Sequence, residues 1–392
     1  MLFTLEALDA AHGDALLLHW GKPDRPRLAV IDGGPAGVFA RSLLPRLEQL
    51  RASRAAGGAL PIRLAMISHI DADHIVGILD WLNRMVDAAD DGEPPAWKVD
   101  AFWLNSFDDI LGNEADELAA AVRSAAAAAA ADRPLPADFP FRHKDSALVA
   151  ASVNQGRKVR DQLARLKIRR NAEADGKLVT ADIDKVPKID LKDGLKFTVL
   201  APFAHRVKDL QEEWDKTVEK VKKAQPGEAQ AIAAEFLDDS VFNLSSIVVL
   251  AEANRKRMLL TGDARGDDII AGLEAARLVK QGRTHVDLLK IPHHGSERNV
   301  STPFFRQVTA DHYVISADGK HGNPDRPMLE MLTQARGSDA YTIHLTNLPG
   351  PPHEAKTFLD RDRRENDRNY TVVVRDTTAP SLRIDLGDKL TD

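Results

Sequence analysis

Apolar and polar residues follow one another in short blocks along this chain, and most apolar blocks have the length of a β-strand. Blocks bounded by Gly, Pro, Asn or Asp predict strands, while apolar residues recurring every three or four positions predict helices. The predicted strands cover residues 2–8, 15–20, 28–31, 64–67, 99–104, 195–200, 245–250, 258–260, 286–291, 312–316, 341–345, 370–374 and 382–384. The predicted helices cover residues 39–50, 74–86, 207–236 and 267–280. Two β-rich blocks with flanking helices predict a mixed α/β (α+β) fold arranged as a four-layer αββα sandwich.

One long segment, residues 106–193, departs from this pattern. It contains an alanine tract of high helix propensity at residues 125–131, and it separates two predicted strands. We therefore predict one domain over residues 1–392, with 106–193 as a helical, partly basic insertion. A loop of this length inside a compact fold is usually functional or flexible.

The basic part of the insertion lies at residues 157–170, which hold seven basic residues and one acidic residue. This part is either a solvated helical face or a surface that contacts phosphate groups. In the second interpretation the contacts come from the ends of the segment, at Arg157, Lys158, Arg169 and Arg170. The insertion could also be the target of a regulatory protein or a trypsin-like protease. A helical decoration used for dimerisation is the remaining alternative, and the oligomeric state stays open.

Composition limits the partners and the chemistry. The chain has 392 residues, of which 43% are hydrophobic and 29% charged, enough for a large core. It has no cysteine, so metal binding would fall to His, Asp, Glu or Asn. The net charge of −6 does not by itself indicate nucleic-acid binding, which would need a local basic patch. We see no signal peptide and no run of about 18 apolar residues, so we expect a cytoplasmic chain without a membrane span.

Four side chains of the kinds that bind metals lie close together after the predicted strand 64–67. They are His69, Asp71, Asp73 and His74. Imidazole and carboxylate are the usual ligands of Zn²⁺, and Mn²⁺ accepts the same set. In an extended loop residues two apart point the same way, so His69 and Asp71 can hold one ion, while Asp73 and His74 face a second. The alternative is a polar loop in which Asp73 caps the following helix.

Two later stretches place further ligands just past buried strands. Asp263 follows the strand 258–260, where its two carboxylate oxygens could bridge two ions or merely cap a turn. His293 and His294 follow the strand 286–291, and adjacent histidines in that place are uncommon in a purely structural role.

These stretches carry a resemblance to a known family. Residues 68–74 resemble the His-x-His-x-Asp-His signature of the metallo-β-lactamase fold, with Asp71 in place of the second histidine. That variant is typical of the metallo-β-lactamase-like domain of bacterial competence DNA-uptake proteins. The Thr-Gly-Asp at 261–263 and the Pro-His-His-Gly-Ser at 292–296 are similar to motifs of the same domains. The similar motifs are scattered over residues 1–330, outside the insertion.

The resemblance implies two divalent ions, with Zn²⁺ favoured and Mn²⁺ tolerated because the site is rich in carboxylates. The ligands that it implies are His69, Asp71, Asp73, His74, Asp263 and His293. It makes His294 a substrate contact or proton donor, and the roles of His293 and His294 could be reversed.

Further residues belong to this comparison through looser matches. Asp32 lies in an Asp-x-Gly stretch like the one that supports the metals from behind, although a Gly-rich turn with an Asp cap explains it equally well. No histidine occurs where the family has its third metal-site histidine. Asn243 matches an Asn-x-x-Ser motif there, and Asp239 lies nearby, so we expect one of the two as a weak ligand.

The Ser-rich loop after residue 316 also has a loose counterpart in the family. His321 or Lys320 in this loop could protonate a leaving group or contact a phosphate, and a plain loop is the alternative. The Gly13-Asp14-Ala15 stretch resembles a Gly-x-Gly-Asp-Ala pattern, with His12 between the glycine positions. We expect His12 to be structural.

Taken together, the motifs predict a metal-dependent hydrolase in which water activated by two metal ions attacks the substrate. Asp73 would orient the water, and His294 or His321 would protonate the leaving group. The resemblance and the basic segment favour a nuclease or phosphodiesterase acting on DNA or another nucleic acid. The alternatives are a hydrolase of small esters, lactones or amides, and a metal-binding regulatory module without activity. The retained Asp263 and histidine pair argue against an inactive module.

Overall fold

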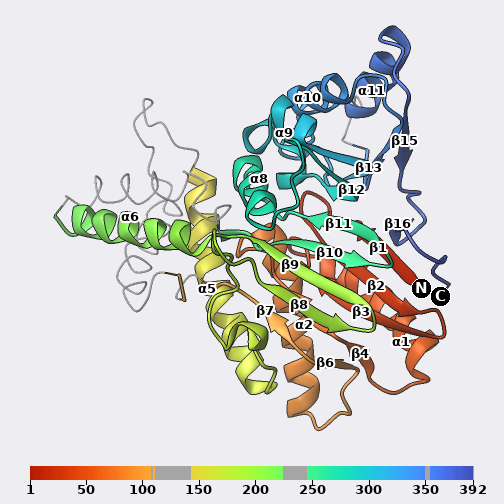
Figure 1. The fold of residues 1–392 in the computed structure, drawn as a ribbon. Coiled ribbons are helices and arrows are strands. Elements are labelled where there is room, and N and C mark those ends of the chain that lie inside the picture. The colour runs from red at the N-terminus through yellow and green to blue at the C-terminus, as the bar shows by residue number, and fades with distance from the viewer. Residues whose placement is uncertain (107–108, 111–142, 224–244, 349–353, 392) are drawn as a thin grey trace.

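Strands from both ends of the chain share the first of two large sheets. The computed structural model describes residues 1–106, 109–110, 143–223, 245–348 and 354–391 (Figure 1). Within these residues the first sheet has the order β16-β1-β2-β3-β5-β7. Its strands are β1 (Leu2–Leu8), β2 (Leu16–Lys22), β3 (Arg25–Ile31), β5 (Leu64–Met66), β7 (Phe102–Trp103) and β16 (Ser381–Asp385). The two ends of the chain meet beside this sheet, where the Met1 ammonium lies 2.5 Å from Asp388 Oδ2.

The second sheet takes most of its strands from the later half of the chain. Among the described residues its order is β15-β14-β13-β12-β11-β10-β9-β8. Its strands are β8 (Lys188–Lys192), β9 (Leu195–Ala201), β10 (Val248–Ala253), β11 (Lys256–Leu260), β12 (Thr284–Lys290), β13 (Val308–Ile315), β14 (Tyr341–Leu345) and β15 (Tyr370–Val374). A short separate sheet pairs β4 (Leu60–Ile62) with β6 (Trp97–Val99).

Each large sheet combines antiparallel and parallel pairing. In the first sheet β1, β2, β3 and β16 pair in antiparallel fashion, whereas β5 is parallel to both β3 and β7. In the second sheet β8 to β11 are antiparallel, and β11 to β15 run parallel. Parallel strands need crossover connections, and here these connections carry helices. The same arrangement brings the carboxyl ends of several strands to one edge.

A shared apolar core lies between the two large sheets. On β1 the side chains of Phe3, Leu5 and Ala7 belong to this core, as strand alternation requires. The rings of Trp103 on β7 and Phe197 on β9 meet edge to face with their centres 5.8 Å apart. The sheets therefore pack face to face.

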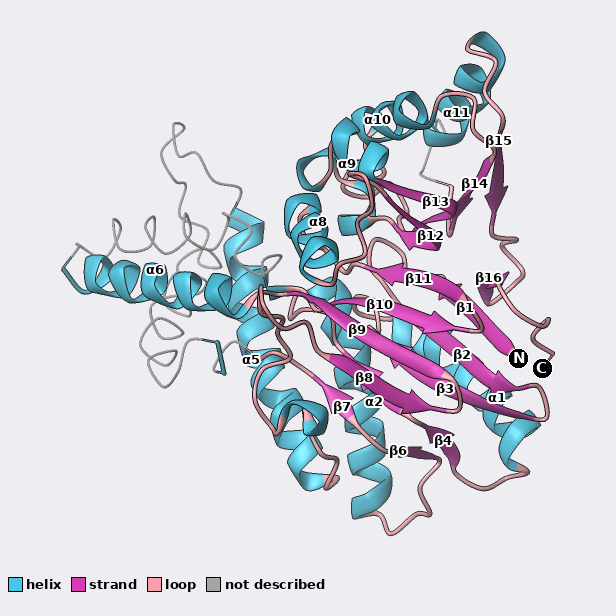
Figure 2. Cartoon of the chain, viewed as in Figure 1, coloured by secondary structure: helices cyan, strands magenta, loops and turns pink. Residues whose placement is uncertain are grey.

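Helices cover the outer face of each sheet (Figure 2). One apolar cluster joins the first sheet to α1, α2 and α5, and another joins the second sheet to α8, α9, α10 and α11. The helices of the described chain are α1 (Leu44–Ala55), α2 (Ala72–Asp90), α5 (His143–Arg165), α6 (Ala204–Lys223), α8 (Gly266–Ala275), α9 (Thr302–Gln307), α10 (Arg326–Arg336) and α11 (Glu354–Glu365). Helix α6 projects away from the sheets (Figure 1). The predicted mixed α/β class is confirmed.

Two predicted elements differ from the observed ones, and two others lie partly or wholly outside the described residues. The strand predicted over 99–104 is split into β6 and β7, which join different sheets. Residues 188–192, assigned to the insertion 106–193, form β8 and pair with β9, so the insertion ends earlier than predicted. Of the helix predicted over 207–236, the structure describes the part within α6, and the alanine tract 125–131 lies outside the described residues. Within the described residues, no helix combines the length and apolar character needed to cross a membrane.

Candidate metal centre

The predicted ligands meet at the edge where parallel strands of both sheets end. β5 leads into the loop before α2, which contains His69 and Asp71. β11 ends shortly before Asp263, and β12 ends shortly before His293 and His294. Ligands of sheet proteins commonly bind beyond the carboxyl ends of parallel strands, because the loops of several strands converge there. Segments distant in the chain thereby contribute to one site.

Asp263 lies at the centre of the site, and its carboxylate is buried. Its Oδ1 is 3.3 Å from His74 Nε2. Its Oδ2 is 3.4 Å from His294 Nε2, 3.7 Å from His293 Nε2 and 3.8 Å from His69 Nε2. Four imidazoles therefore face one carboxylate, as a bridging role requires.

One group of candidate ligands is especially close. Donor atoms of Asp73, His74, Asp263 and His294 all lie within 4.8 Å of one another. His294 Nε2 is 3.2 Å from Asp73 Oδ2, and His294 is 3% exposed. The structure thus places His294 within the closest group of candidate ligands, while His293 Nε2 also faces Asp263.

The remaining predicted ligands lie on the Oδ2 side of Asp263. His69 Nε2 is 3.4 Å from Asp71 Oδ2, and the His293 side chain, 31% exposed, also faces Asp263 Oδ2. These side chains could hold a second ion together with Asp263. Asn243 and Asp239, the proposed weak ligands, lie outside the described residues.

Several buried donor atoms of the group have no hydrogen-bond partner. They are Nε2 of His69, Nε2 of His74, Nε2 of His294 and Oδ1 of Asp263. A buried polar atom without a partner costs about 1–3 kcal/mol, and such atoms are rare in folded proteins. A bound cation would satisfy all of them at once, so the donor set fits a divalent ion.

The other ring nitrogen of each histidine is held by an oxygen atom. His74 Nδ1 lies 2.9 Å from Asp32 Oδ2, and His294 Nδ1 donates to the Ser316 carbonyl oxygen over 3.0 Å. His293 Nδ1 lies 2.7 Å from Asn299 Oδ1, and His69 Nδ1 lies 3.2 Å from the Ser68 hydroxyl. Where Nδ1 carries the proton of a neutral imidazole, the Nε2 lone pair is free to bind a metal.

Asp32 supports His74 from behind. Its carboxylate also accepts hydrogen bonds from the Ser68 amide and the Ser68 hydroxyl, each 2.7 Å long. The turn that carries Asp32 packs backbone to backbone against α2, where the Gly33 amide donates to the His74 carbonyl over 2.8 Å. A Cβ atom on Gly77 would lie 1.9 Å from the Gly33 carbonyl oxygen. This approach requires glycine at both positions.

We expect Gly77→Ala to damage the site through this contact. The added methyl would push α2 away from the turn, lengthen the Asp32 to His74 hydrogen bond and cost about 2–3 kcal/mol of unfolding free energy. Denaturant unfolding and metal analysis of the purified variant would measure both effects. Gly156→Ala is a matched control because Gly156 is also helical, but its added Cβ would lie at an ordinary 3.7 Å from Ile70. A Gly77→Ala protein as stable and as rich in metal as the Gly156→Ala protein would contradict this interpretation.

Opposite charges in the group hold one another in the ionised form. Burial alone would lower the pKa of His74, but the carboxylates of Asp263, Asp73 and Asp32 raise it well above the usual range. The pKa of His294 is also raised, since burial is outweighed by Asp263 and Asp14. Burial would raise the pKa of Asp73, but His74 and His294 lower it. A metal ion would therefore have to displace protons from the imidazoles.

Two charged residues beneath the group were not predicted as site residues. Asp14 and Lys290 form a fully buried ion pair, with Lys290 Nζ also 3.9 Å from Asp263 Oδ1. Burial would raise the pKa of Asp14, but Lys290, His294 and His74 lower it to about 2. The sequence signal for Lys290 was a lysine within the apolar run 288–291, directly before the two histidines.

His12, expected to be structural, lies at the rim of the site with His321. Their rings meet edge to face with centres 5.0 Å apart. Two hydrogen bonds hold the loop of His12 against the site. The Asp14 amide donates to the Asp73 carbonyl over 3.2 Å, and Ser316 Oγ donates to the Gly13 carbonyl over 2.6 Å. Burial lowers the pKa of His12. The charge of Asp73 raises this pKa and the charge of Lys320 lowers it, and the net shift is downward.

The basic segment of the insertion borders the metal loop but is partly neutralised. Gly156 of α5 packs beside Ile70 of the loop. Arg170 forms a two-pronged ion pair with Asp109, and Arg165 lies 2.6 Å from Asp90.

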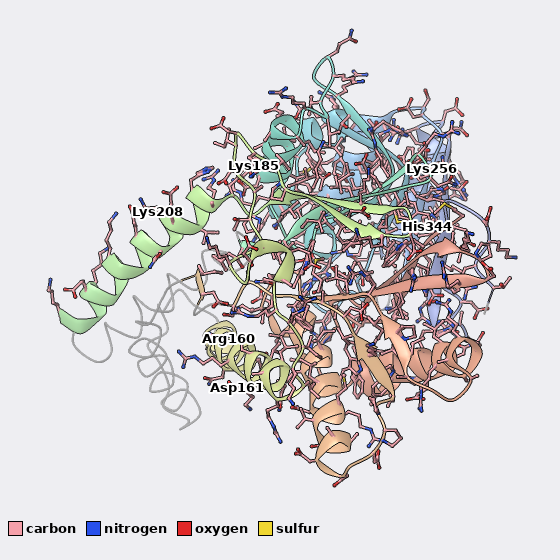
Figure 3. All side chains as sticks on the ribbon, turned by 60° about the horizontal axis from the view of Figure 1, so that its bottom comes forward. Arg160, Asp161, Lys185, Lys208, Lys256 and His344 are labelled. Carbon is pink, nitrogen blue, oxygen red and sulfur yellow. The ribbon has the colours of Figure 1, made fainter. Side chains whose placement is uncertain are left out.

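Arg160 of the same segment also lies 3.9 Å from Asp109 Oδ1. Lys158 is exposed on α5, and the Arg169 carbonyl accepts from the Phe102 amide. Figure 3 shows Arg160 and Asp161 on the same helix. Arg170, one of the four predicted phosphate contacts, is thus engaged with an acidic side chain.

Comparison with known proteins assigns no family. No protein-family model matches the chain. Part of the chain is similar to microtubule-associated protein 1A of Homo sapiens, with 26% identity over 133 residues, which is 30% of this chain and 5% of that protein. The proteins of the same name from Rattus norvegicus and Mus musculus are 28% identical over 111 residues, 26% of this chain and 4% of theirs. The matches thus span about a twentieth of the length of these relatives.

Proposed function

We propose that the chain is a metal-dependent hydrolase of the metallo-β-lactamase fold that cleaves phosphodiesters in nucleic acid. The observation that carries the proposal is the set of buried, unpartnered ligand atoms around Asp263. The packing order of helices, sheet, sheet and helices supports the fold assignment, since it is the order expected for that family.

Two groups of residues would hold two divalent ions, with Zn²⁺ preferred and Mn²⁺ acceptable to so many carboxylates. One group is Asp73, His74, Asp263 and His294. The other is His69, Asp71, Asp263 and His293. Ions bound there would supply an activated water and would stabilise negative charge that develops on the substrate.

The open side of the site suggests how the protein's own groups take part. The side chains of Asp71 and Asp73 are 30% and 24% exposed, whereas Asp263 and His294 are buried. Of the two exposed carboxylates, Asp73 belongs to the closest ligand group. We assign it the task of orienting the attacking water and accepting its proton. To His321, whose ring meets that of His12 at the rim, we assign the donation of a proton to the leaving group.

The choice of phosphodiesters rests on the rim and on the insertion. Lys320 lies in the same rim loop as His321 and offers positive charge beside a site that would accept anions once metals are bound. Helix α5 brings Arg157 and Lys158 next to Gly156, which packs on the metal loop. A polyanion lying over the metals could contact both the rim loop of Lys320 and these two residues of α5. The pairing of Arg170 with Asp109 argues for a shorter contact surface than the whole segment 157–170.

The proposal is tested by removing and restoring the metal. The purified protein is stripped with a chelator, reloaded with Zn²⁺ or Mn²⁺, and offered a bis-aryl phosphate, a lactone and plasmid DNA. We expect the reloaded protein to cleave the phosphodiester and the DNA and the stripped protein to cleave neither. Hydrolysis of the lactone alone would replace the nuclease assignment with a small-ester hydrolase. Bound metal without turnover of any substrate would leave a regulatory metal-binding module.

A further inference from the structure

Lys290 is a lysine without any exposed surface, at the end of β12 between apolar neighbours. Taking a charged ammonium out of water costs several kcal/mol unless a partner of opposite charge repays it. The partner is Asp14, which is also buried, and Lys290 Nζ additionally donates to the Gly262 carbonyl over 3.3 Å. The strand residue therefore reaches across to the loop after β1.

This ion pair touches the candidate ligands from behind. Lys290 Nζ lies 3.9 Å from Asp263 Oδ1, the oxygen that faces His74. Asp14 Oδ1 lies 3.5 Å from His294 Nδ1, and Asp14 Oδ2 lies 4.0 Å from His74 Nδ1. The pair thus lies beside three members of the closest ligand group, at Nδ1 of both histidines and at Oδ1 of Asp263.

The surrounding charges explain why a cation is needed there. Asp14, Asp32, Asp71, Asp73 and Asp263 bring five carboxylates into a small volume, and Asp14, Asp32 and Asp263 are fully buried. Like charges repel strongly where water is excluded. Two divalent ions would neutralise this repulsion, whereas the metal-free chain depends on its own cationic side chains.

We propose that Lys290 is a positioning residue that acts as a built-in cation and keeps Asp14 and Asp263 together before any metal binds. The inference rests on the metal site proposed above. Because a lysine ammonium and a bound metal ion would both offset the same carboxylates, the loss of Lys290 should be felt most by the metal-free protein. Metal binding and the Lys290 charge should therefore be coupled.

Thermal unfolding of Lys290→Met, with and without Zn²⁺, tests this coupling. We expect the melting temperature of the stripped variant to fall by about 5 °C or more relative to the stripped parent, because a buried carboxylate loses its partner. The melting temperature of the zinc-loaded variant should fall by less than half as much. The zinc gap, meaning the difference in melting temperature between loaded and stripped protein, should therefore widen. Lys256→Met is the matched control (Figure 3). Lys256 also forms an ion pair, 2.6 Å from Asp287, but 44% of its side chain is exposed to solvent. In that variant the gap should equal that of the parent.

The possible outcomes separate this inference from the proposed function. Equal losses with and without zinc would overturn the role of Lys290 and leave the metal site intact. A parent protein that gains no stability from zinc would instead defeat the metal site itself. A Lys290→Met chain that folds with zinc alone would support the inference outright.

A second variant decides the case in which Lys290→Met folds under neither condition. Lys290→Met combined with Asp14→Asn removes both charges, so it should fold without metal and keep a zinc gap close to that of the parent. A double variant that also fails to fold would count against the inference.

Discussion

Asp263→Ala should empty both metal positions at once. Asp263 is the one carboxylate whose two oxygens face His74 on one side and His69, His293 and His294 on the other. Its loss would take a ligand from each ion and expose two cations to each other without a shared anion. Metal affinity should fall by more than the roughly 10–100-fold typical of residues that only support a ligand. Metal analysis after reloading and dialysis would show the stoichiometry drop from as many as two ions per chain to nearly none.

The matched control for this change is Asp267→Asn. Asp267 lies four residues further along, in the first turn of α8, and 55% of its side chain is exposed in an ion pair with Arg265. That variant should keep the metal content of the parent. Full metal content in Asp263→Ala, at unchanged circular dichroism, would remove the bridging assignment.

Asp73→Ala and His74→Ala should each abolish metal-dependent phosphodiester cleavage while leaving the fold intact. Asp73 is the partly exposed carboxylate assigned to the attacking water, and a positioned base contributes about 10²–10⁴-fold to the rate. His74 should matter at least as much, because its Nε2 is an unpartnered donor atom beside Asp263. Steady-state rates on a bis-aryl phosphate, together with far-ultraviolet circular dichroism, measure both quantities.

A histidine outside the ligand group supplies the control for these variants. His285 is half exposed on β12 and pairs with Asp311, so His285→Ala should keep the activity of the parent. Asp73→Ala or His74→Ala proteins as active as His285→Ala would show that the chemistry lies elsewhere.

Local patterns were sufficient to predict most of the core strands, and they named most of the side chains that the structure brings together around Asp263. Apolar blocks such as Leu2–Leu8 are recognisable because each strand is short and bounded by turn residues. The ligands of the loop after β5 are close in sequence, so their shared position follows from the chain itself. The split of residues 99–104 into two strands was missed because pairing with β4 and with β5 decides it, and neither partner is local.

Which of the two adjacent histidines points into the closest ligand group could not be predicted, because it depends on an unusual backbone conformation. His293 and His294 have φ values of 48° and 54°, and Gly295 follows at 89°. Residues other than glycine seldom adopt this left-handed backbone conformation. A strand-like or helical continuation would point other side chains inward, so the inward turn of His294 emerges only from the folded loop.

The rim and the buried ion pair were missed for a related reason. His12 meets His321, and Asp14 meets Lys290, across hundreds of residues of chain. Such contacts depend on how the loop after β1 packs between the metal loop and the segment after β13. No local pattern encodes that packing.

Anomalous diffraction at the zinc edge, from crystals of the reloaded protein, tests the central claim most directly. We expect two zinc peaks flanking Asp263, one bonded to His74 and His294 and the other to His69 and Asp71. Ligand bonds of about 2.0–2.2 Å would identify direct coordination by imidazole nitrogen and carboxylate oxygen. Zinc peaks elsewhere in the molecule, with no peak within bonding distance of Asp263, would contradict it.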